Sequence, residues 1–248
     1  TSKLPILYYN GLVSKTENYY LITGSSSGLG EALSRQLNQG GYNTLGLDKI
    51  EGEYTNHKID LSNISTEDIL KITESLNGKK IDAIVHCAAI QKNSGNDFES
   101  ISDTFDEVFS VNVKSAYILV KTLEKEFTDF SKLCIISSVH AKATTKNNTL
   151  YASSKSAIHG LVNGLTLEKN EKMSIFELIL GAMDSPMLLN SFDKNEIEDL
   201  KQELPSKNIL QPAEIAQFII DLIDNYAKIL HGSSIVLDNG VLSKLSTK

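Results

Sequence analysis

Residues 19–30, which read YYLITGSSSGLG, decide the fold of this chain. The first five are mainly apolar and aromatic, which predicts a buried strand that runs directly into a glycine-rich turn. After Gly30, the apolar residues Ala32, Leu33 and Leu37 have helical spacing, and this pattern stops at the glycine pair 40–41. A strand, a glycine-rich turn and a helix in this order let backbone N–H groups face a pyrophosphate.

The alternation of strands and helices continues along the rest of the chain. We expect further strands at residues 43–48, 57–59, 81–86, 132–137 and 174–180, and a last strand that ends near 237–240. We expect helices at about 66–76, 102–127 and 150–170. Such repeated units predict an α/β fold of the Rossmann type, a doubly wound parallel sheet of about seven strands with helices on both faces.

Length and composition favour a single globular domain. The chain has 248 residues, of which 41% are hydrophobic, enough for a substantial core. We assign residues 19–248 to one nucleotide-binding domain and leave residues 1–18 as an N-terminal arm of unassigned role. No apolar run is long enough for a membrane span, and the first residues lack the pattern of a secretory signal, so we expect a cytoplasmic protein.

Charge and cysteine content exclude several classes of function. The net charge is −7 without a basic stripe, which argues against nucleic acids and anionic membranes as partners. Arg35 is the only arginine, so a strongly anionic substrate would depend on lysines or backbone amides. Cys87 and Cys134 lie in short apolar runs and read as core residues, with no spacing that indicates a disulfide or a metal site.

Asp48 ends the second predicted strand and is a candidate selector of the cofactor. A carboxylate at this position accepts hydrogen bonds from both ribose hydroxyls of NAD and repels the 2′-phosphate of NADP. Ser27 in the turn brings no positive charge, although the neighbouring Lys49 keeps NADP open as the alternative. We therefore expect NAD as the preferred cofactor.

Tyr151 and Lys155 are four residues apart at the start of a predicted helix, so their side chains lie on one helical face. A phenol has a pKa of about 10 and exchanges protons poorly at neutral pH. A neighbouring ammonium group favours the phenolate and lowers that pKa. The pair is therefore a candidate for general acid–base catalysis.

Together these residues resemble the short-chain dehydrogenase/reductase family in its compact single-domain form, over about residues 19–240. The turn at 23–30 matches the family's T-G-x-x-x-G-x-G pattern, and Asp60-Leu61 matches the pair that holds adenine. The resemblance implies a catalytic set of Ser138, Tyr151, Lys155 and Asn112. It also implies that the cofactor is bound by Thr23, Gly24, Ser26, Ser27, Gly28, Leu29, Gly30, Asp48, Asp60, Leu61, Cys87, Ala88, Ala89, Tyr151, Lys155, Gly181, Met183 and Ser185.

The chain departs from the family pattern at three places. Cys87-Ala88-Ala89 stands where the family has Asn-Ala-Gly, which affects the approach of this turn to the cofactor. Leu180-Gly181 replaces a usual Pro-Gly, which makes the entry to the following loop less rigid. Ser185 replaces a common threonine but keeps a hydroxyl group that can reach the carboxamide of the cofactor.

The function implied by the resemblance is hydride transfer between nicotinamide and a secondary alcohol or ketone. Ser138 would orient the substrate oxygen, Tyr151 would transfer the proton, Lys155 would stabilise the phenolate, and Asn112 would hold a water of the proton relay. The substrate pocket would be formed by Ser138, His140, Tyr151, Met183 and Met187. The segment 183–205 would form a substrate loop, which we interpret as a lid with an apolar underside.

Two alternatives remain open at this point. A cofactor-binding sensor or scaffold without turnover is possible on the same fold, although such proteins usually lose catalytic positions and this chain keeps all four. Within the enzyme class, a 3-oxoacyl-carrier-protein reductase is disfavoured by the scarcity of arginine, and a sugar, polyol or small hydroxy compound fits equally well. The resemblance also implies a homodimer or homotetramer that pairs the helices at 102–127 and 150–170.

Overall fold

One seven-stranded sheet forms the centre of the computed structural model, which describes residues 17–244. The strands have the order β3-β2-β1-β4-β5-β6-β7, and every neighbouring pair is parallel. Their bounds are β1 (Tyr19–Thr23), β2 (Asn43–Asp48), β3 (His57–Lys58), β4 (Ile81–His86), β5 (Phe127–Ser138), β6 (Met173–Leu180) and β7 (Ser233–Leu237). The predicted Rossmann-type α/β fold is confirmed, while residues 1–16 of the predicted arm lie outside the described residues.

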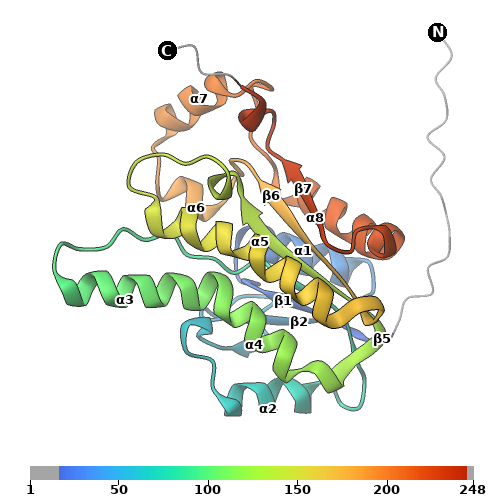
Figure 1. The fold of residues 1–248 in the computed structure, drawn as a ribbon. Helices are drawn as coiled ribbons and strands as arrows, with labels where there is room; N and C mark the ends of the chain where they lie inside the picture. Colours follow the sequence, from blue (N-terminus) through green and yellow to red (C-terminus); the bar gives the residue numbers. More distant parts are fainter. Residues whose placement is uncertain (1–16, 245–248) are drawn as a thin grey trace, which may run out of the picture.

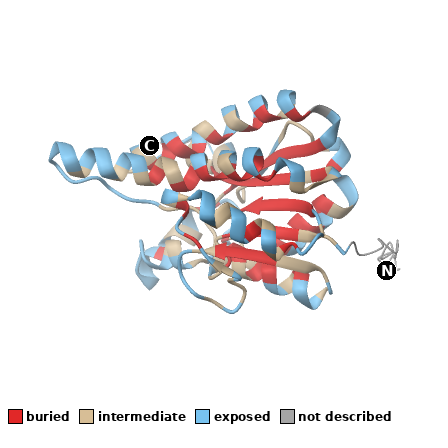
Figure 2. Ribbon diagram, turned by 90° about the horizontal axis from the view of Figure 1, so that it is seen from below, coloured by how far each residue is buried: buried red, intermediate tan, exposed pale blue. Residues whose placement is uncertain are grey.

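Helices cover both faces of the sheet (Figure 1). One face carries α1 (Gly28–Gln39) and α8 (Pro212–Asp221). The other carries α2 (Thr66–Ser75), α3 (Phe98–Phe109), α4 (Ser115–Thr122) and α5 (Thr149–Lys169). Figure 2 shows the buried sheet between these layers and the exposed outer sides of the helices. None of the helices in the described part of the chain has the length and apolar character of a membrane span.

The predicted helix at 102–127 is wrong in extent. It begins at Phe98, where the Asp97 carboxylate accepts a hydrogen bond from the Ser100 amide, and it is interrupted by a π-turn at Ser110–Lys114. Phe127 instead begins β5 and pairs with Ile81 across an irregular register. That pairing is a long-range contact, so the local pattern of residues could not indicate it.

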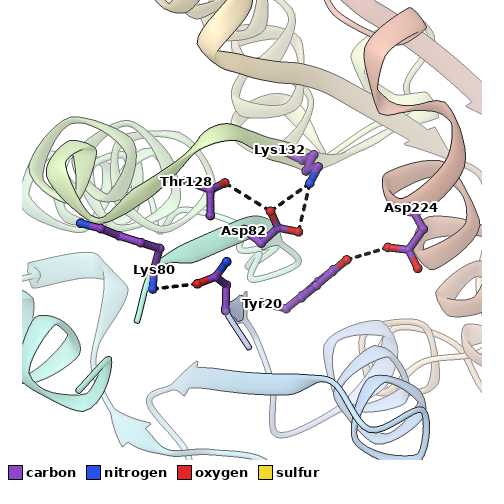
Figure 3. A network of polar contacts seen from close by, with 7 residues as sticks. Tyr20, Lys80, Asp82, Thr128, Lys132 and Asp224 are labelled. Carbon is purple, nitrogen blue, oxygen red and sulfur yellow. Dashed lines mark hydrogen bonds and ion pairs between the residues drawn. The ribbon is translucent and has the colours of Figure 1, made fainter. Parts of the chain in front are cut away.

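A polar network closes the amino ends of the central strands, at the edge opposite the glycine-rich turn (Figure 3). Tyr20 and Tyr42 both donate hydrogen bonds to the Asp224 carboxylate, the first at 2.7 Å. Lys132 forms an ion pair with Asp82, with its Nζ 3.0 Å from each carboxylate oxygen. Burial is the main reason that the pKa of Tyr20 is raised, so this phenol stays protonated. These contacts give Tyr20, Asp82 and Asp224 polar partners and fasten the segment after α8 to the sheet.

Gly30 lets helix α1 pass close to the glycine-rich turn. A Cβ at Gly30 would lie 2.1 Å from the carbonyl oxygen of Gly24, which is backbone and cannot move aside easily. Gly24 itself has a φ of 72°, a conformation that residues other than glycine rarely adopt. The close packing of helix on turn therefore requires these two glycines.

We expect Gly30→Ala to lower the free energy of unfolding by roughly 1–3 kcal/mol, because the new methyl group overlaps with backbone. Gly164→Ala on α5 is the matched control. Its Cβ would meet nothing within 4 Å, so the better helix propensity should stabilise the chain by about 0.5–1 kcal/mol. Urea unfolding of both variants measures the difference, and equal effects of the two substitutions would contradict the packing argument.

Candidate active site

The carboxyl end of β2 and the glycine-rich turn after β1 are joined by Asp48. Its Oδ2 accepts hydrogen bonds from the amide (3.0 Å) and the hydroxyl (2.8 Å) of Ser26, and its Oδ1 accepts from the Ile50 amide. The structure thus places Asp48 against the glycine-rich turn, and the sequence predicted that both bind the same cofactor. An ionised carboxylate has about four acceptor positions, so Asp48 retains capacity for a further hydroxyl donor.

The other predicted adenine contacts lie one strand further along the sheet. Asp60 follows β3 and accepts hydrogen bonds through Oδ1 from the amide and hydroxyl of Ser62. These hydrogen bonds are the main reason that the pKa of Asp60 is lowered. Leu61 is buried beside it in the core under α2 and α4. Asp60 is exposed and keeps its second oxygen available at the carboxyl edge.

His86 links the glycine-rich turn to the π-turn between α3 and α4. Its Nδ1 lies 2.9 Å from the Thr23 hydroxyl, which also accepts a hydrogen bond from the Ala88 amide. Its Nε2 lies 3.2 Å from the carbonyl oxygen of Val111. Burial, assisted by the charge of Lys155, lowers the pKa of His86 to about 3. The ring is therefore neutral, with Nε2 donating to Val111 and Nδ1 accepting from Thr23.

The linking role of His86 was not predicted from the sequence. The signal that could have indicated the linking role was a polar residue at the last position of an otherwise apolar strand, next to the ligand-binding edge.

Asn112 lies in the π-turn, and its side chain is fully buried. The Oδ1 atom accepts from the Ile90 amide at 2.8 Å, while Nδ2 donates to the Ile90 carbonyl and to the Ser154 hydroxyl. Both amide hydrogens are thus used by the protein. In this arrangement the Asn112 side chain fixes the segment after β4 against α5, and the water that the resemblance implied has no side-chain donor from it.

Three of the four predicted catalytic residues meet where β5 ends and α5 begins. Ser138 is the last residue of β5, and its Oγ accepts a hydrogen bond from the His140 amide at 3.2 Å. Tyr151 and Lys155 lie in the first turns of α5, with the Lys155 Nζ 5.6 Å from the Tyr151 ring centroid. The His140 ring stands edge-on to the Tyr151 ring, so this histidine is packed on the site and not merely solvated.

The pKa values of this group differ from the sequence-based expectation. Burial raises the pKa of Tyr151, and a hydrogen bond with Ser138 only partly opposes this, so the phenol is protonated in the free protein. Burial lowers the pKa of Lys155 to about 8, and its Nζ donates to the Ile136 carbonyl at 2.8 Å. The protein groups alone therefore do not lower the pKa of Tyr151 as the Tyr–Lys spacing led us to expect.

The segment after β6 covers the glycine-rich turn. The Gly181 amide donates to the Leu237 carbonyl, and Met183 forms a parallel bridge with Leu210. Ser185 and the following proline border Gly28, since a Cβ at Gly28 would lie 3.6 Å from the Cβ of Ser185. The predicted cofactor residues on either side of the edge are thus within contact of each other.

Most of the predicted substrate loop is helical. It contains α6 (Pro186–Leu189), which includes Met187, and α7 (Lys194–Glu203). A small core of Ile197, Leu204 and Ile209 holds these helices, with Leu188 packed against it. Leu189 and Phe192 are exposed, at 55% and 41%. The apolar residues of this segment therefore fall into two groups, one packed in the small core and one exposed to solvent.

Comparisons with known proteins agree with this geometry. The family model described as Enoyl-(Acyl carrier protein) reductase matches residues 24–242. The chain is 29% identical over 165 residues to the Glucose and ribitol dehydrogenase homolog 2 of Arabidopsis thaliana, a match that covers 66% of this chain and 56% of that protein. It is 28% identical to the Uncharacterized oxidoreductase YmfI of Bacillus subtilis (strain 168), over 89% of this chain and 97% of that protein.

Solved structures show the same fold. The ligand-free aldohexose dehydrogenase of Thermoplasma acidophilum superposes with a TM-score of 0.83 at 23% sequence identity. The match covers 94% of this chain and 97% of that chain. At this identity the likeness supports the arrangement of strands and helices, and the chemistry has to be argued from the site.

The neutral state of His86 predicts a contribution to acid unfolding. Its pKa is about 3 in the folded chain and about 6.5 when unfolded, so the unfolded chain binds more protons between these values and stability falls as pH decreases through this window. His86→Asn cannot titrate, so its stability should fall less steeply from pH 6.5 towards pH 3. Urea midpoints measured across this range test the prediction, and parallel curves for the two proteins would contradict it.

Proposed function

Because this chain belongs to the short-chain dehydrogenase/reductase family, we propose that it transfers a hydride between a nicotinamide cofactor and a secondary alcohol or the matching ketone. The observation that carries the proposal is the meeting of Ser138, Tyr151 and Lys155 at the carboxyl end of β5, next to the end of β4. A proton donor, an oxygen-orienting hydroxyl and a buried cation are the groups that carbonyl reduction requires.

The residues at the carboxyl edge fit a dinucleotide. Gly24 and Gly28 have φ values of 72° and 56°, and the turn between them leads into the N-terminus of α1, which is a favourable place for a pyrophosphate. Asp48 and Asp60 keep carboxylate oxygens for a ribose and an adenine. Cys87, Ala88 and Ala89 are only half-buried, consistent with a surface that a ligand covers. When bound, the nicotinamide ring supplies or accepts the hydride.

The protein groups would handle the proton. The Ser138 oxygen accepts from the His140 amide, and the Ser138 hydroxyl also hydrogen-bonds with Tyr151. A substrate oxygen bound here would take the place of the Ser138–Tyr151 contact and accept from both hydroxyls. In reduction, the protonated Tyr151 gives its hydrogen to that oxygen as the hydride reaches the carbonyl carbon, which yields the alcohol and a phenolate. The Lys155 ammonium group beside the ring stabilises this phenolate. Oxidation of the alcohol reverses each step.

Asn112 would contribute by holding Tyr151 in place and not by contacting the substrate. Its amide holds Ile90 on one side and Ser154 on the other, and Ser154 in turn donates to the Tyr151 carbonyl. The first turn of α5 is therefore tied to the loop after β4 at Ile90. This link keeps Tyr151 in a fixed orientation relative to the cofactor edge.

For the substrate we favour a small hydroxylated compound such as a sugar or polyol. Two of the similar proteins are named as dehydrogenases of glucose and ribitol or of aldohexoses. The matching family is named for an acyl-carrier-protein reductase, but the net charge of −7 and the single arginine disfavour docking of an anionic carrier.

A second copy of the chain is the partner that we propose for α3 and α4. Phe98, Ile101 and Phe105 are spaced along one side of α3 and are 83%, 45% and 44% exposed, and Tyr117 on α4 is 42% exposed. Apolar helical stripes of this kind need a partner. A homodimer or homotetramer would cover them.

Tyr151→Phe should lower turnover by about 10²–10⁴-fold, because it removes the proton donor and little else. The affinity for NADH, measured by fluorescence titration, should change by less than a few-fold. Tyr226→Phe is the matched control, because this tyrosine is 52% exposed and lies at the amino edge of the sheet, and it should behave as the wild type. Turnover of Tyr151→Phe near the wild-type rate would disprove the assignment, and tight NADH binding without turnover on any alcohol or ketone would favour the sensor alternative.

Separate titrations with NADH and NADPH test the role of Asp48. We expect tighter binding of NADH, because the carboxylate repels a 2′-phosphate, and we expect Asp48→Ser to reduce this preference at least tenfold, which corresponds to about 1.4 kcal/mol. Lys49→Met is the control for the neighbouring cation. A preference for NADPH in the wild type that Lys49→Met abolishes would show that Lys49 overrides Asp48.

A further inference from the structure

Glu177 is a buried carboxylate to which neither the sequence pattern nor the proposed mechanism assigns a role. It lies in the middle of β6 and has no exposed surface. Its Oε1 accepts hydrogen bonds from the Ser234 hydroxyl at 2.6 Å and from the His159 Nδ1 at 2.8 Å. Its Oε2 is buried and has no hydrogen-bond partner among the described residues. A buried carboxylate oxygen without a partner is costly unless a positive charge lies nearby.

His159 supplies such a charge only when its ring is protonated, and its side chain is 56% exposed, so the permanent candidates are the buried cations in the described part of the chain. Two lysines are buried, Lys155 at 2% and Lys169 at 7% exposure. Lys169 already forms an ion pair with Glu124. Among the described residues, Lys155 donates its hydrogen bond to the neutral carbonyl of Ile136. Lys155 is thus a buried ammonium group without an ion-pair partner of its own.

The fold places these two groups at one interface. Lys155 and His159 are one helical turn apart on α5, and His159 contacts Glu177 directly. On the sheet, Glu177 is paired in register with Ile135, the neighbour of the Ile136 whose carbonyl holds Lys155. Helix α5 lies over β5 and β6 in Figure 1, so both charges lie between the same helix and the same two strands.

We propose that Glu177 is a positioning residue of the active site, whose buried negative charge keeps the Lys155 side chain in its ammonium form. The inference rests on the proposed function only in so far as Lys155 serves the chemistry there. It concerns the state of Lys155 in the free protein, which can be measured without cofactor or substrate.

The other groups around Lys155 cannot take this role. Burial lowers the pKa of Lys155 to about 8, and negative charge at Cys87 or Glu177 would oppose this. Burial raises the pKa of Cys87 to about 12, so the thiol is uncharged near neutral pH. His86 is neutral as well, and Tyr151 is protonated. Among the titratable groups that face Lys155, Glu177 is therefore the one that can carry a negative charge.

A negative charge at Glu177 would serve the proposed reaction, because it would keep Lys155 protonated. A lysine whose pKa is about 8 would lose its proton at mildly alkaline pH and would then no longer stabilise the Tyr151 phenolate. Ser234 and His159 hold Glu177 from the side away from the reacting groups, at the β7 edge and on the outer part of α5. The charge thus supports Lys155 without contacting the substrate oxygen.

The decisive experiment is a titration of Lys155 by NMR in the free protein, with lysines labelled at Cε and the Lys155 signal identified by its loss in Lys155→Met. Glu177→Gln removes the charge and keeps an oxygen for Ser234 and His159. The Lys155 midpoint should move to lower pH in this variant. Glu168→Gln removes an exposed charge from the same helix, where Glu168 pairs with Lys121, and should leave the midpoint unchanged.

Further variants separate charge from packing. Glu177→Asp keeps the charge, so its Lys155 midpoint should stay closer to the wild type than that of Glu177→Gln. If the amide variant does not fold, Glu177→Met removes the charge with an apolar side chain of similar length, a kind of replacement that buried ionic groups often tolerate. An unchanged midpoint in the uncharged variants, or equal midpoints in Glu177→Asp and Glu177→Gln, would overturn the proposal.

The pH profile of turnover gives an independent readout. In Glu177→Gln the loss of activity at alkaline pH should begin at lower pH than in the wild type, while the Ser234→Ala variant, which keeps the charge, should retain the wild-type alkaline limb. Identical shifts in both variants would show a merely structural role. The Lys155 titration remains interpretable even if no substrate is found, so its failure is distinct from failure of the proposed function.

Discussion

The buried ammonium group of Lys155 is the constraint on which the rest of the active site depends. It has 2% exposure and is held by a backbone carbonyl of β5, yet the chemistry that we propose for Tyr151 needs its positive charge. Moving a cation out of water costs free energy, and for this reason burial lowers the pKa of Lys155 to about 8. The groups around it must therefore be either neutral or negative. His86, Cys87 and Tyr151 are neutral, and our proposal gives the negative charge to Glu177.

The site is fixed by hydrogen bonds between segments far apart in the sequence. Thr23 joins the glycine-rich turn to His86 at the end of β4, and His86 joins β4 to the π-turn. Asn112 in that turn joins the loop after β4 to Ser154 on α5. Each bond is made by a neutral, buried side chain with both partners present, so the network is stable without a net charge. The reacting groups are thus oriented before a ligand binds.

The fold and the place of the candidate site could be predicted from the sequence, because the local residue patterns and the order of the elements indicated the same fold. The strand–turn–helix at 19–30, the alternation of elements and the Tyr–Lys spacing each have a local signature, and the structure places all of them at one edge. The start of β5 at Phe127 and the contact of Glu177 with Ser234 depend on pairing between distant strands, which leaves no local trace. The sign of the pKa change at Tyr151 also depends on burial, which spacing alone cannot give.

Two π-turns show how polar groups are brought into an otherwise apolar helix–sheet interface. One at Ser110–Lys114 carries Asn112, and the other at Leu222–Tyr226 carries Asp224. The first lies at the carboxyl edge of the sheet and the second at the amino edge, where Asp224 accepts from Tyr20.

A π-turn inserts one extra residue and alters the helical hydrogen bonding, so carbonyl groups become available to other donors. The Val111 carbonyl shows the result, because it accepts from both His86 and the Ser115 hydroxyl. The π-helical segment at Ser110–Lys114 therefore supplies a buried amide, Asn112, which holds Ile90 and Ser154, and a backbone acceptor, the Val111 carbonyl, which holds His86. Through Ser154 this segment also aligns the start of α5 with the loop after β4.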